Sequence, residues 1–361
     1  MKPIAKVVFY PVLVVNICFT GLLLFSAYSP YIHPEDYPRL SIAGLLFPIL
    51  LAINILFLVF WLFFRSKLVF FTLVALLLCI PQIRISIPIN FHTNDIPEES
   101  FKFLSYNVMR FANLEKRNGK NPIITYLKKE NADILCIQEY DVSTNADYLT
   151  QKDVEKELKM YPYNNIKKIG NQGLHLGCFS KYPILSSRII DSKSISNGAV
   201  IYELKIGQDT VMLINCHLES NKLTKEDKVI YEDILKAPET NKVKKGTRQL
   251  MSKLAEASII RAKQARIIAE EIVTLHHPHV IVCGDFNDVS TSYTHRTISK
   301  YLKDAFTESG CGLGISYNQN KFYFRIDHIL TDKKSEIYNC TVDRSIHDSD
   351  HYPIKCRIAF P

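Results

Sequence analysis

The first 90 residues of this 361-residue chain differ sharply from the rest, and this division constrains the fold more than any other feature. They are overwhelmingly apolar and contain three stretches, at about 4–28, 40–64 and 68–88, that are candidates for membrane spans. A helix needs roughly 20 apolar residues to cross a bilayer. Later residues alternate charged and apolar runs. We therefore expect a membrane anchor over 1–89, a linker over 90–100 and one large domain over 101–361.

The first apolar stretch predicts an anchor and not a cleaved signal peptide. Its apolar core is too long, no clean small-residue cleavage site follows, and two more apolar stretches come after it. The third stretch is short before Pro81, Gln82 and Arg84, so it spans only if Arg84 reaches the membrane interface.

The basic residues near these stretches predict the orientation in the membrane. Lys2 and Lys6 precede the first stretch, and Arg65 and Lys67 lie between the second and third. Cytoplasmic loops carry an excess of Lys and Arg, so the amino terminus is expected inside. Three spans then place the large domain outside the cytoplasm, at a bacterial inner or plasma membrane. If the third stretch is only interfacial, the domain faces inward.

The net charge and the cysteine content give little information about the function. The net charge of +8 favours anionic partners such as phosphates, nucleic acid or anionic lipid head groups, but it does not choose among them. The nine cysteines form no CxxC pair and no regular framework, so they suggest neither a zinc site nor a disulfide scaffold.

From residue 101 onwards, apolar runs of four to eight residues are typical of buried strands, and most of them place polar residues at one end. The runs are "FKFLSYNV" with Asn107, "ADILCIQEY" with Glu139, "TVMLINCHLES" with His217, "HVIVCGDFND" with Asp285 and Asn287, "FRIDHILTD" with Asp327, and "DSDHYPIKCRI" with Asp350 and His351.

Helices are expected between some of these strands. Apolar residues at helical spacing predict a helix over 121–132, with Asn121 as its cap, and a long amphipathic helix over 249–277. Residues 221–246 have mixed charge and no clean period, which favours a solvated insertion. Strands and helices mixed in this way suggest two sheets packed face to face with helices outside.

If the strands end on one side of the stacked sheets, their polar residues form one cluster rich in carboxylates. Such carboxylates raise one another's pKa unless a cation neutralises them. A hard divalent ion with oxygen ligands is expected, Mg²⁺ first and Mn²⁺ as the alternative. This type of site suits phosphoryl transfer.

The motifs "SYNV", "IQEY", "NCHLES", "GDFND", "RIDHIL" and "SDHYPI", in this order, resemble those of the endonuclease/exonuclease/phosphatase superfamily. The resemblance covers about residues 101–361. It implies an α/β fold, a four-layered sandwich of two mixed β-sheets flanked by helices, with the active site at one edge of the sheets. It also implies hydrolysis of a phosphate ester by in-line attack of water, without a covalent intermediate.

The resemblance also implies roles for the strand-end residues. Glu139 corresponds to the principal metal ligand, Asn107 to a ligand or phosphate-positioning group beside it, and Asp350 to a residue near the metal. Two of these residues also have a simpler interpretation. Asn107 is alternatively a turn or capping residue, and Glu139 the first solvated residue after a strand.

The catalytic roles fall on the remaining strand-end residues. Asp285 resembles the group that orients or deprotonates the attacking water, and Asn287 one that holds the phosphate. His351, oriented by Asp327, resembles the imidazole that donates to a phosphate oxygen. His217 resembles a second histidine near the leaving group. Asp285 and Asn287 are alternatively plain Asx-turn residues.

The chain differs at two positions from the abasic-site endonucleases of this superfamily, and these differences argue against that activity. Abasic-site endonucleases carry an acid where this chain has Met109, and a tyrosine where it offers His217. We therefore expect a membrane-anchored, Mg²⁺-dependent phosphoesterase acting on phosphodiesters or phosphomonoesters. The substrate stays open among lipid head groups, nucleic acids and inositol phosphates, and no obligate protein partner is expected. The alternatives are a metal-dependent nuclease and a catalytically degenerate, membrane-tethered binding protein.

Overall fold

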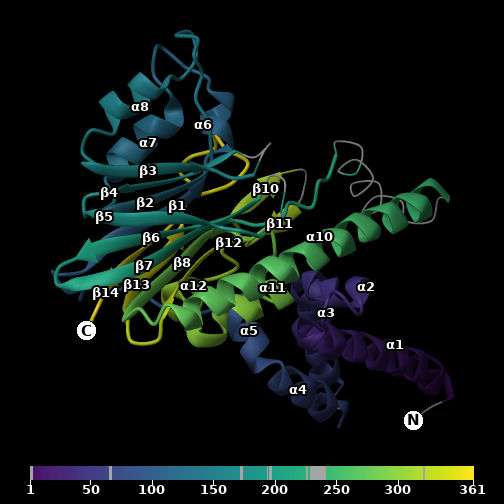
Figure 1. Cartoon of the computed structure of the whole chain (residues 1–361). Coiled ribbons are helices and arrows are strands. Elements are labelled where there is room, and N and C mark those ends of the chain that lie inside the picture. Colours follow the sequence, from purple (N-terminus) through teal and green to yellow (C-terminus); the bar gives the residue numbers. More distant parts are fainter. Residues whose placement is uncertain are drawn as a thin grey trace.

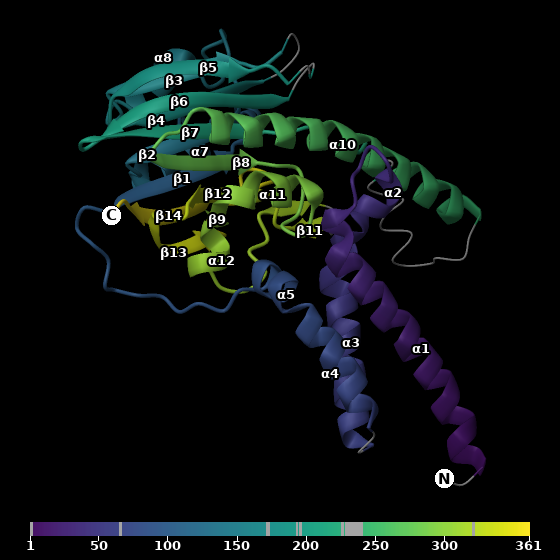
Figure 2. The ribbon, with the colours of Figure 1, turned by 60° about the horizontal axis from the view of Figure 1, so that its bottom comes forward.

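The computed structural model describes residues 3–64, 67–170, 174–192, 194, 197–224, 227, 241–319 and 322–361. A helical bundle formed by the amino-terminal residues projects from one side of a larger domain built on β-sheets (Figures 1 and 2). The bundle contains α1 (Pro3–Tyr28), η1 (Ser29–Tyr31), α2 (Pro38–Ser41), η2 (Ile42–Leu46), α3 (Phe47–Phe63), α4 (Leu68–Leu78) and α5 (Ile80–Ser86).

Two segments of the bundle, Phe9–Tyr31 and Pro38–Phe63, are long and apolar enough to cross a membrane. The third expected span is bent: α4 and α5 meet at an angle of 61° and reach the required length only together. Pro81 is the second residue of α5, where proline is tolerated because the first helical N–H groups need no intrahelical partner. The charged positions Lys2 and Arg65, used to predict the orientation, lie outside the described residues.

Polar side chains join α1, α3 and α4 and fix their relative directions. The Asn16 side-chain oxygen accepts hydrogen bonds from Trp61 Nε1 (2.9 Å) and Thr72 Oγ1 (3.3 Å). The Tyr28 hydroxyl donates to the Leu78 carbonyl (2.9 Å). Positions 16 and 28 of α1 therefore pair with 72 and 78 of α4, so these two helices are parallel. Helix α3, which lies between α1 and α4 in the sequence, is antiparallel to both (Figure 2).

The larger domain contains two six-stranded mixed sheets. The first has the order β13-β14-β1-β2-β4-β3 and the second β5-β6-β7-β8-β12-β9. Their strands are β1 (Phe101–Asn107), β2 (Ile134–Tyr140), β3 (Tyr163–Lys168), β4 (His175–Ser180), β5 (Ile184–Ile190), β6 (Gly198–Ile206), β7 (Asp209–His217), β8 (His279–Asp285), β9 (Leu302–Asp304), β12 (Asp327–Asp332), β13 (Glu336–Val342) and β14 (Ile354–Ala359). A separate hairpin pairs β10 (Tyr317–Gln319) with β11 (Phe322–Phe324).

The sheets pack face to face, and helices cover their outer faces, so the four-layered sandwich is confirmed (Figure 1). Phe103, Val200 and Ile281 belong to the core between the sheets. Apolar residues of α7 pack on the first sheet and those of α10 on the second. The helices of this domain are α6 (Met109–Asn113), α7 (Pro122–Glu130), α8 (Gln151–Glu157), α10 (Asn241–Thr274), α11 (Tyr293–Ile298), η3 (Ser299–Tyr301) and α12 (Ala305–Ser309).

Two expected helices are present. Helix α7 begins after Asn121, whose side-chain oxygen accepts from the N–H groups of Ile123 and Ile124, both at 3.1 Å. The long amphipathic helix is α10, but it begins at Asn241 and not near 249. The expected solvated insertion therefore includes helical residues at 241–246, while 225–226 and 228–240 lie outside the described residues.

The start of the predicted linker packs against the domain. The Asn90 side-chain amide donates to the carbonyls of Thr307 (3.0 Å) and Gly310 (2.8 Å). Ile89 forms a β-bridge with Cys311. These contacts attach the end of the helical bundle to one place on the domain.

Candidate active site

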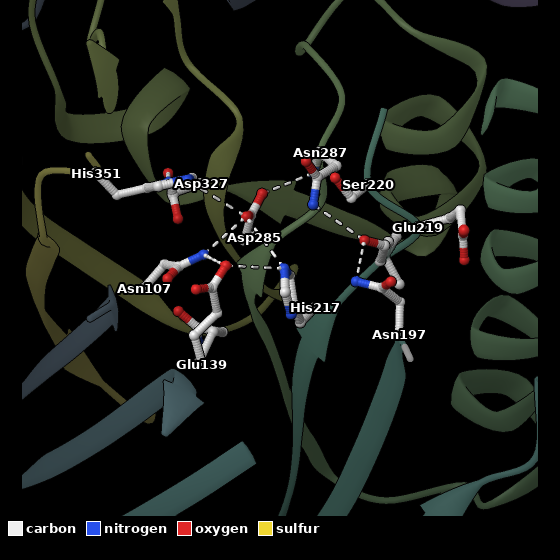
Figure 3. Close-up of polar contacts among 12 residues, drawn as sticks. Asn107, Glu139, Asn197, His217, Glu219, Ser220, Asp285, Asn287, Asp327 and His351 are labelled. Carbon is white, nitrogen blue, oxygen red and sulfur yellow. Dashed lines mark hydrogen bonds and ion pairs between the residues drawn. The ribbon is translucent and has the colours of Figure 1, made fainter. Parts of the chain in front are cut away.

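Strand pairing brings the polar strand ends to one edge of the sandwich. The parallel pair β7–β8 places His217 beside Asp285, and β12, antiparallel to β8, places Asp327 on the other side of Asp285. In the first sheet the parallel pair β1–β2 places Asn107 beside Gln138, one residue before Glu139. Because the carboxyl ends of parallel strands meet at the same edge, both pairs end here. Figure 3 shows the resulting cluster.

Asp285 lies at the centre of the cluster and is buried. Its Oδ1 accepts the Asn287 backbone N–H (2.8 Å), and its Oδ2 accepts the Asn107 side-chain amide (3.1 Å). The same Oδ2 lies 3.7 Å from His217 Nε2 and 3.6 Å from His351 Nε2. Asp285 therefore connects both sheets and both expected histidines (Figure 3).

His351 is held by a carboxylate on its other ring nitrogen. Its Nδ1 lies 2.7 Å from Asp327 Oδ2. Asp327 is held in turn by the Ser316 hydroxyl, which accepts the Asp327 backbone N–H (3.0 Å). A carboxylate on Nδ1 fixes the imidazole tautomer and leaves Nε2 directed at Asp285.

Glu139 forms the opposite wall and is more exposed than Asp285. Its Oε1 accepts the Asn107 amide (3.2 Å) and lies 3.7 Å from His217 Nε2. About a quarter of its side chain is accessible to solvent, compared with 1% for Asp285. Asn107 thus bridges the two carboxylates through its NH₂ group, while its Oδ1 accepts the Met109 backbone N–H (3.1 Å).

Burial and charge change the acidity of this cluster. Burial raises the pKa of Asp285, and the nearby Asp327 carboxylate adds to this effect. Burial opposes the charged form of His351, but the carboxylates of Asp327 and Asp285 outweigh it and raise the pKa of the imidazole well above its usual value. Burial, with Glu139 and Asp285, also raises the pKa of Asp350.

Backbone conformation at the site is unusual. Glu139 and Asn287 have positive φ angles of 55° and 52°. Six consecutive residues from Met109 to Leu114, directly after the Asn107 strand, also have positive φ between 44° and 68° and form a left-handed turn. Each costs roughly 1–2 kcal/mol for a residue other than glycine. Strain of this kind persists where packing over-determines it, and it concentrates at functional sites.

Packing holds the left-handed turn in place. Phe111 is buried, and its ring contacts Tyr140 with centroids 5.2 Å apart. The Asn121 amide donates to the Phe111 carbonyl (2.7 Å), and Arg110 pairs with Asp141 (2.7 Å). The turn therefore ties the end of β1 to the residues that follow Glu139.

Gly284, in the "GDFND" motif, allows β7 and β8 to approach closely at the site. Its φ is 121°, and an added Cβ would lie 2.0 Å from the Cys216 carbonyl oxygen. No other residue type fits there without displacing the backbone beside His217 and Asp285.

Two expected site residues have other contacts. The Asn287 amide donates to the Leu218 carbonyl (3.0 Å), so its NH₂ group is partly engaged by the protein. Asp350 is close enough to interact electrostatically with Glu139 and Asp285, but among the described residues its carboxylate forms no hydrogen bond or ion pair with either of them. Glu219, two residues after His217 in the same motif, accepts from the Ser194 hydroxyl (2.7 Å) and pairs with Lys222 (2.7 Å).

The structure adds residues that the motifs did not single out. Tyr317, on the β10–β11 hairpin, packs edge-on against His351 with ring centroids 5.0 Å apart. Gln138 donates to Asn215 Oδ1 (2.7 Å) and so joins the two sheets below the site. Gln138 and Asn215 lie within quoted motifs, next to the expected residues. Nothing in the local sequence around Tyr317 indicates its position.

The donor set fits a divalent metal ion. The carboxylates of Glu139, Asp285, Asp327 and Asp350 outnumber the two imidazoles, so the cluster has an excess of negative charge. Asp285, Asp327 and His351 each offer a ligand atom within 4.8 Å of the others. Asp327 Oδ1 is buried and has no hydrogen-bond partner among the described residues. A hard cation would satisfy these oxygens.

A second buried group, His295, Asp304 and His328, also has spacing suited to a metal. However, Arg325 donates two hydrogen bonds to the Asp304 carboxylate, at 2.9 and 3.1 Å, and thus already supplies its counter-charge. Arg325 also donates to the Ile85 carbonyl at the end of the helical bundle (2.5 Å). We therefore interpret this buried group as structural.

The model of the endonuclease/exonuclease/phosphatase family matches residues 104–351. The chain belongs to this family. A model of a domain of unknown function, DUF8431, matches residues 6–86. The three activities in the family's description all cleave phosphate esters, so this family member is a hydrolase acting on ester bonds.

Solved structures with similar folds include three bacterial proteins. A family member from Beutenbergia cavernae is 13% identical over 72% of each chain, with a TM-score of 0.50. One from Bacteroides thetaiotaomicron is 16% identical over 73% of this chain and 98% of its own, with a TM-score of 0.49. The mannosyl-6-phosphatase of the same organism is 16% identical over 72% and 100%, with a TM-score of 0.48. No curated protein sequence matches the chain.

Proposed function

We propose that the chain is a membrane-anchored phosphoesterase that requires a divalent metal ion, Mg²⁺ first and Mn²⁺ as the alternative, and hydrolyses phosphodiester or phosphomonoester bonds. The observation that carries this proposal is the arrangement of Asp285 between two imidazoles, opposite the partly exposed Glu139. An acid, two potential proton donors and an anionic metal ligand are the groups that water attack on phosphorus needs.

In this proposal Asp285 orients and deprotonates the attacking water. Its Oδ1 is fixed by the Asn287 N–H, and burial raises its pKa, which makes the carboxylate a better proton acceptor. Attack in line with the leaving group then requires no covalent intermediate. Asn287 holds a phosphate oxygen.

The two histidines act on the other oxygens of the phosphate. The carboxylates of Asp327 and Asp285 raise the pKa of His351, which favours its charged form, and its Nε2 donates to a non-bridging oxygen as negative charge develops. His217 lies across Asp285 from His351 and serves the leaving group.

Glu139 holds the metal, with Asn107 and Asp350 beside it. When bound, the ion supplies Lewis-acid polarisation of the phosphate and charge neutralisation. The Asn107 NH₂ group donates to the carboxylates of Glu139 and Asp285. These contacts support a role for Asn107 in positioning the two acids as well as its role as a metal ligand.

We further propose that residues 1–89 anchor the enzyme with three spans. The loop between the first two long helices contacts the large domain: the Thr291 hydroxyl donates to the Gly44 carbonyl (3.0 Å), and Arg266 pairs with Glu35 (3.1 Å). This loop and residues 101–361 therefore share one side of the membrane. The chain can return to that side after α3 only if α4 and α5 cross as a bent third span. With a cytoplasmic amino terminus, the catalytic domain lies outside the cytoplasm.

The test uses the purified full chain in detergent. With Mg²⁺ it should hydrolyse bis(4-nitrophenyl) phosphate, and EDTA should abolish the reaction. Asp285→Asn and His351→Gln should remove activity without loss of fold. DNA, RNA, inositol phosphates and phospholipids form the substrate panel. Wild-type rates in either variant, or binding of every substrate without turnover, would contradict the proposal and favour the degenerate alternative.

A further inference from the structure

A cavity of about 320 Å³ lies where the helical bundle meets the catalytic domain. Its walls come from both parts: Leu45 and Ile49 from the start of the second long helix, Val289 and Ile315 from the domain. The volume is in the range of small-molecule sites, roughly 300–1,000 Å³. The lining is predominantly apolar, which favours an apolar occupant.

The cavity opens to the surface at the level where the helices leave the domain. Three of its lining residues are exposed: Ile49 (57%), Leu313 (45%) and Tyr323 (55%). Tyr31 and Tyr37, in the loop between the first two long helices, are exposed at the same end of the bundle. Exposed tyrosines at one end of apolar helices are typical of the membrane interface. The opening therefore faces the surface of the bilayer.

Two segments of the cavity lining are adjacent in the chain to residues of the active site. Val289, Ser290 and Thr291 line the cavity and begin two residues after Asn287. On the other side of the opening, Ile315 directly precedes Ser316, whose hydroxyl positions Asp327. Residues 289–291 and 315 therefore join the cavity lining directly to chain segments that carry or position catalytic groups.

Close contact with the bundle fixes this wall. A Cβ on Gly44 would lie 1.8 Å from the Thr291 carbonyl oxygen, so the backbones touch directly. The wall therefore depends on the first residues of the apolar segment Pro38–Phe63, and the cavity does not exist in the catalytic domain alone.

Resting on the proposed function, we infer that this cavity holds the hydrocarbon chain of an amphipathic phosphate ester. The substrate class is then a membrane lipid whose phosphate group reaches the Asp285 cluster from the bilayer surface. A cavity with an apolar lining, an opening at the level where the helices leave the domain, and lining residues adjacent in the chain to the active site fits this occupant. A soluble inositol phosphate has no apolar group to fill it.

The test uses a series of alkyl 4-nitrophenyl phosphates with methyl, butyl and octyl chains, which share one leaving group. The full chain is kept in a steroid detergent, which has no alkyl chain to compete for the cavity. Each methylene that enters an apolar site improves binding about fourfold. We expect kcat/KM of the wild type to be roughly 100-fold or more higher for the octyl than for the methyl ester.

The matched variants are Leu45→Trp, which fills the cavity, and Leu46→Trp, whose residue is exposed and does not line it. The octyl-to-methyl ratio of kcat/KM should fall at least tenfold in Leu45→Trp and stay at the wild-type value in Leu46→Trp. The ratio does not depend on how much protein is folded. If Leu45→Trp has no measurable activity, the same comparison is made with Ile49→Trp, which narrows the opening of the cavity.

The outcomes separate the two proposals. Hydrolysis of the methyl ester with no gain for longer chains would overturn the lipid inference and leave the phosphoesterase intact. An equal octyl-to-methyl ratio in Leu45→Trp and the wild type would also overturn it. No metal-dependent hydrolysis of any ester would overturn the proposed function itself, and the inference with it.

Discussion

At the scale of single residues, the site combines one central acid with partners of different kinds. Asp285 accepts hydrogen bonds from Asn107 and Asn287 and lies near His217 and His351. The pair formed by His351 and Asp327 has a counterpart at the far end of the same strand, where Asp332 lies 3.3 Å from His279. This repetition provides a matched control for the role of Asp327.

Asp327→Asn should reduce kcat by roughly 10²–10⁴-fold, because His351 loses the carboxylate that orients it and favours its charged form. Asp332→Asn should leave kcat near the wild-type value. Steady-state kinetics on a soluble phosphodiester measures both. Equal turnover in the two variants would remove Asp327 from the mechanism.

Glu139→Gln should raise the Mg²⁺ concentration for half-maximal activity at least tenfold, since a neutral amide replaces an anionic ligand. Glu219→Gln is the control, because its carboxylate is engaged by Ser194 and Lys222 and not by the cluster. The two variants are compared by measuring the hydrolysis rate as a function of the Mg²⁺ concentration. An unchanged metal requirement in Glu139→Gln would show that another residue holds the ion.

At the scale of elements, two kinds of close contact position the site. Within the second sheet, β7 and β8 approach at Gly284. Within the bundle, buried polar groups such as Asn16 join α1 to α3 and α4. In the sequence, Gly284 and Asn16 are only single residues inside apolar runs. Their effect on the structure depends on the strand or helix that packs against them.

Gly284→Ala should destabilise the protein by about 3 kcal/mol or more, because the new methyl group meets the Cys216 carbonyl and the residue keeps a positive φ. Gly207→Ala, at a turn with open space around it, should cost only about 1 kcal/mol from its positive φ. Denaturation of the purified variants provides the comparison. A smaller loss at Gly284 than at Gly207 would contradict the packing argument.

Asn16→Leu should destabilise the helical bundle by about 1–2 kcal/mol, since Trp61 and Thr72 lose their acceptor in an apolar surrounding. Ile17→Leu, at the neighbouring exposed position, should have almost no effect. Unfolding in mixed micelles measures both. Equal stability of the two variants would mean that the polar contacts do not hold the bundle.

At the scale of the whole molecule, the amino-terminal loop and the catalytic domain form one assembly. Contacts from Glu35 to Arg266 and from Gly44 to Thr291 join segments more than 200 positions apart. Arg325 adds a third connection to Ile85. The position of the helical bundle relative to the domain is therefore set by contacts between distant segments (Figure 2).

Cysteine labelling in intact cells tests this arrangement, after replacement of the exposed Cys18 and Cys311 by serine. Asp36→Cys and a cysteine added after Pro361 should both react with a membrane-impermeant maleimide from outside. Lys67→Cys should react only after the cells are opened. Labelling of position 36 and the carboxyl terminus from opposite sides would refute the three-span anchor.

The sequence alone determined the division into an apolar segment and a sandwich domain, and it identified the residues at the strand ends. It could do so because apolar runs and the polar residues that end them are local patterns. Asn107, Glu139, His217, Asp285, Asp327 and His351 were named in this way, and the structure places them together.

Only the tertiary structure decided how these residues are supported. The contact of Tyr317 with His351, the amide of Asn107 between two carboxylates, and the docking of Gly44 on Thr291 depend on the packing of distant segments. No local pattern encodes such contacts, because each is fixed by the shape of a neighbouring element. The apolar cavity beside the site arises in the same way, from two parts of the chain that are separate in sequence.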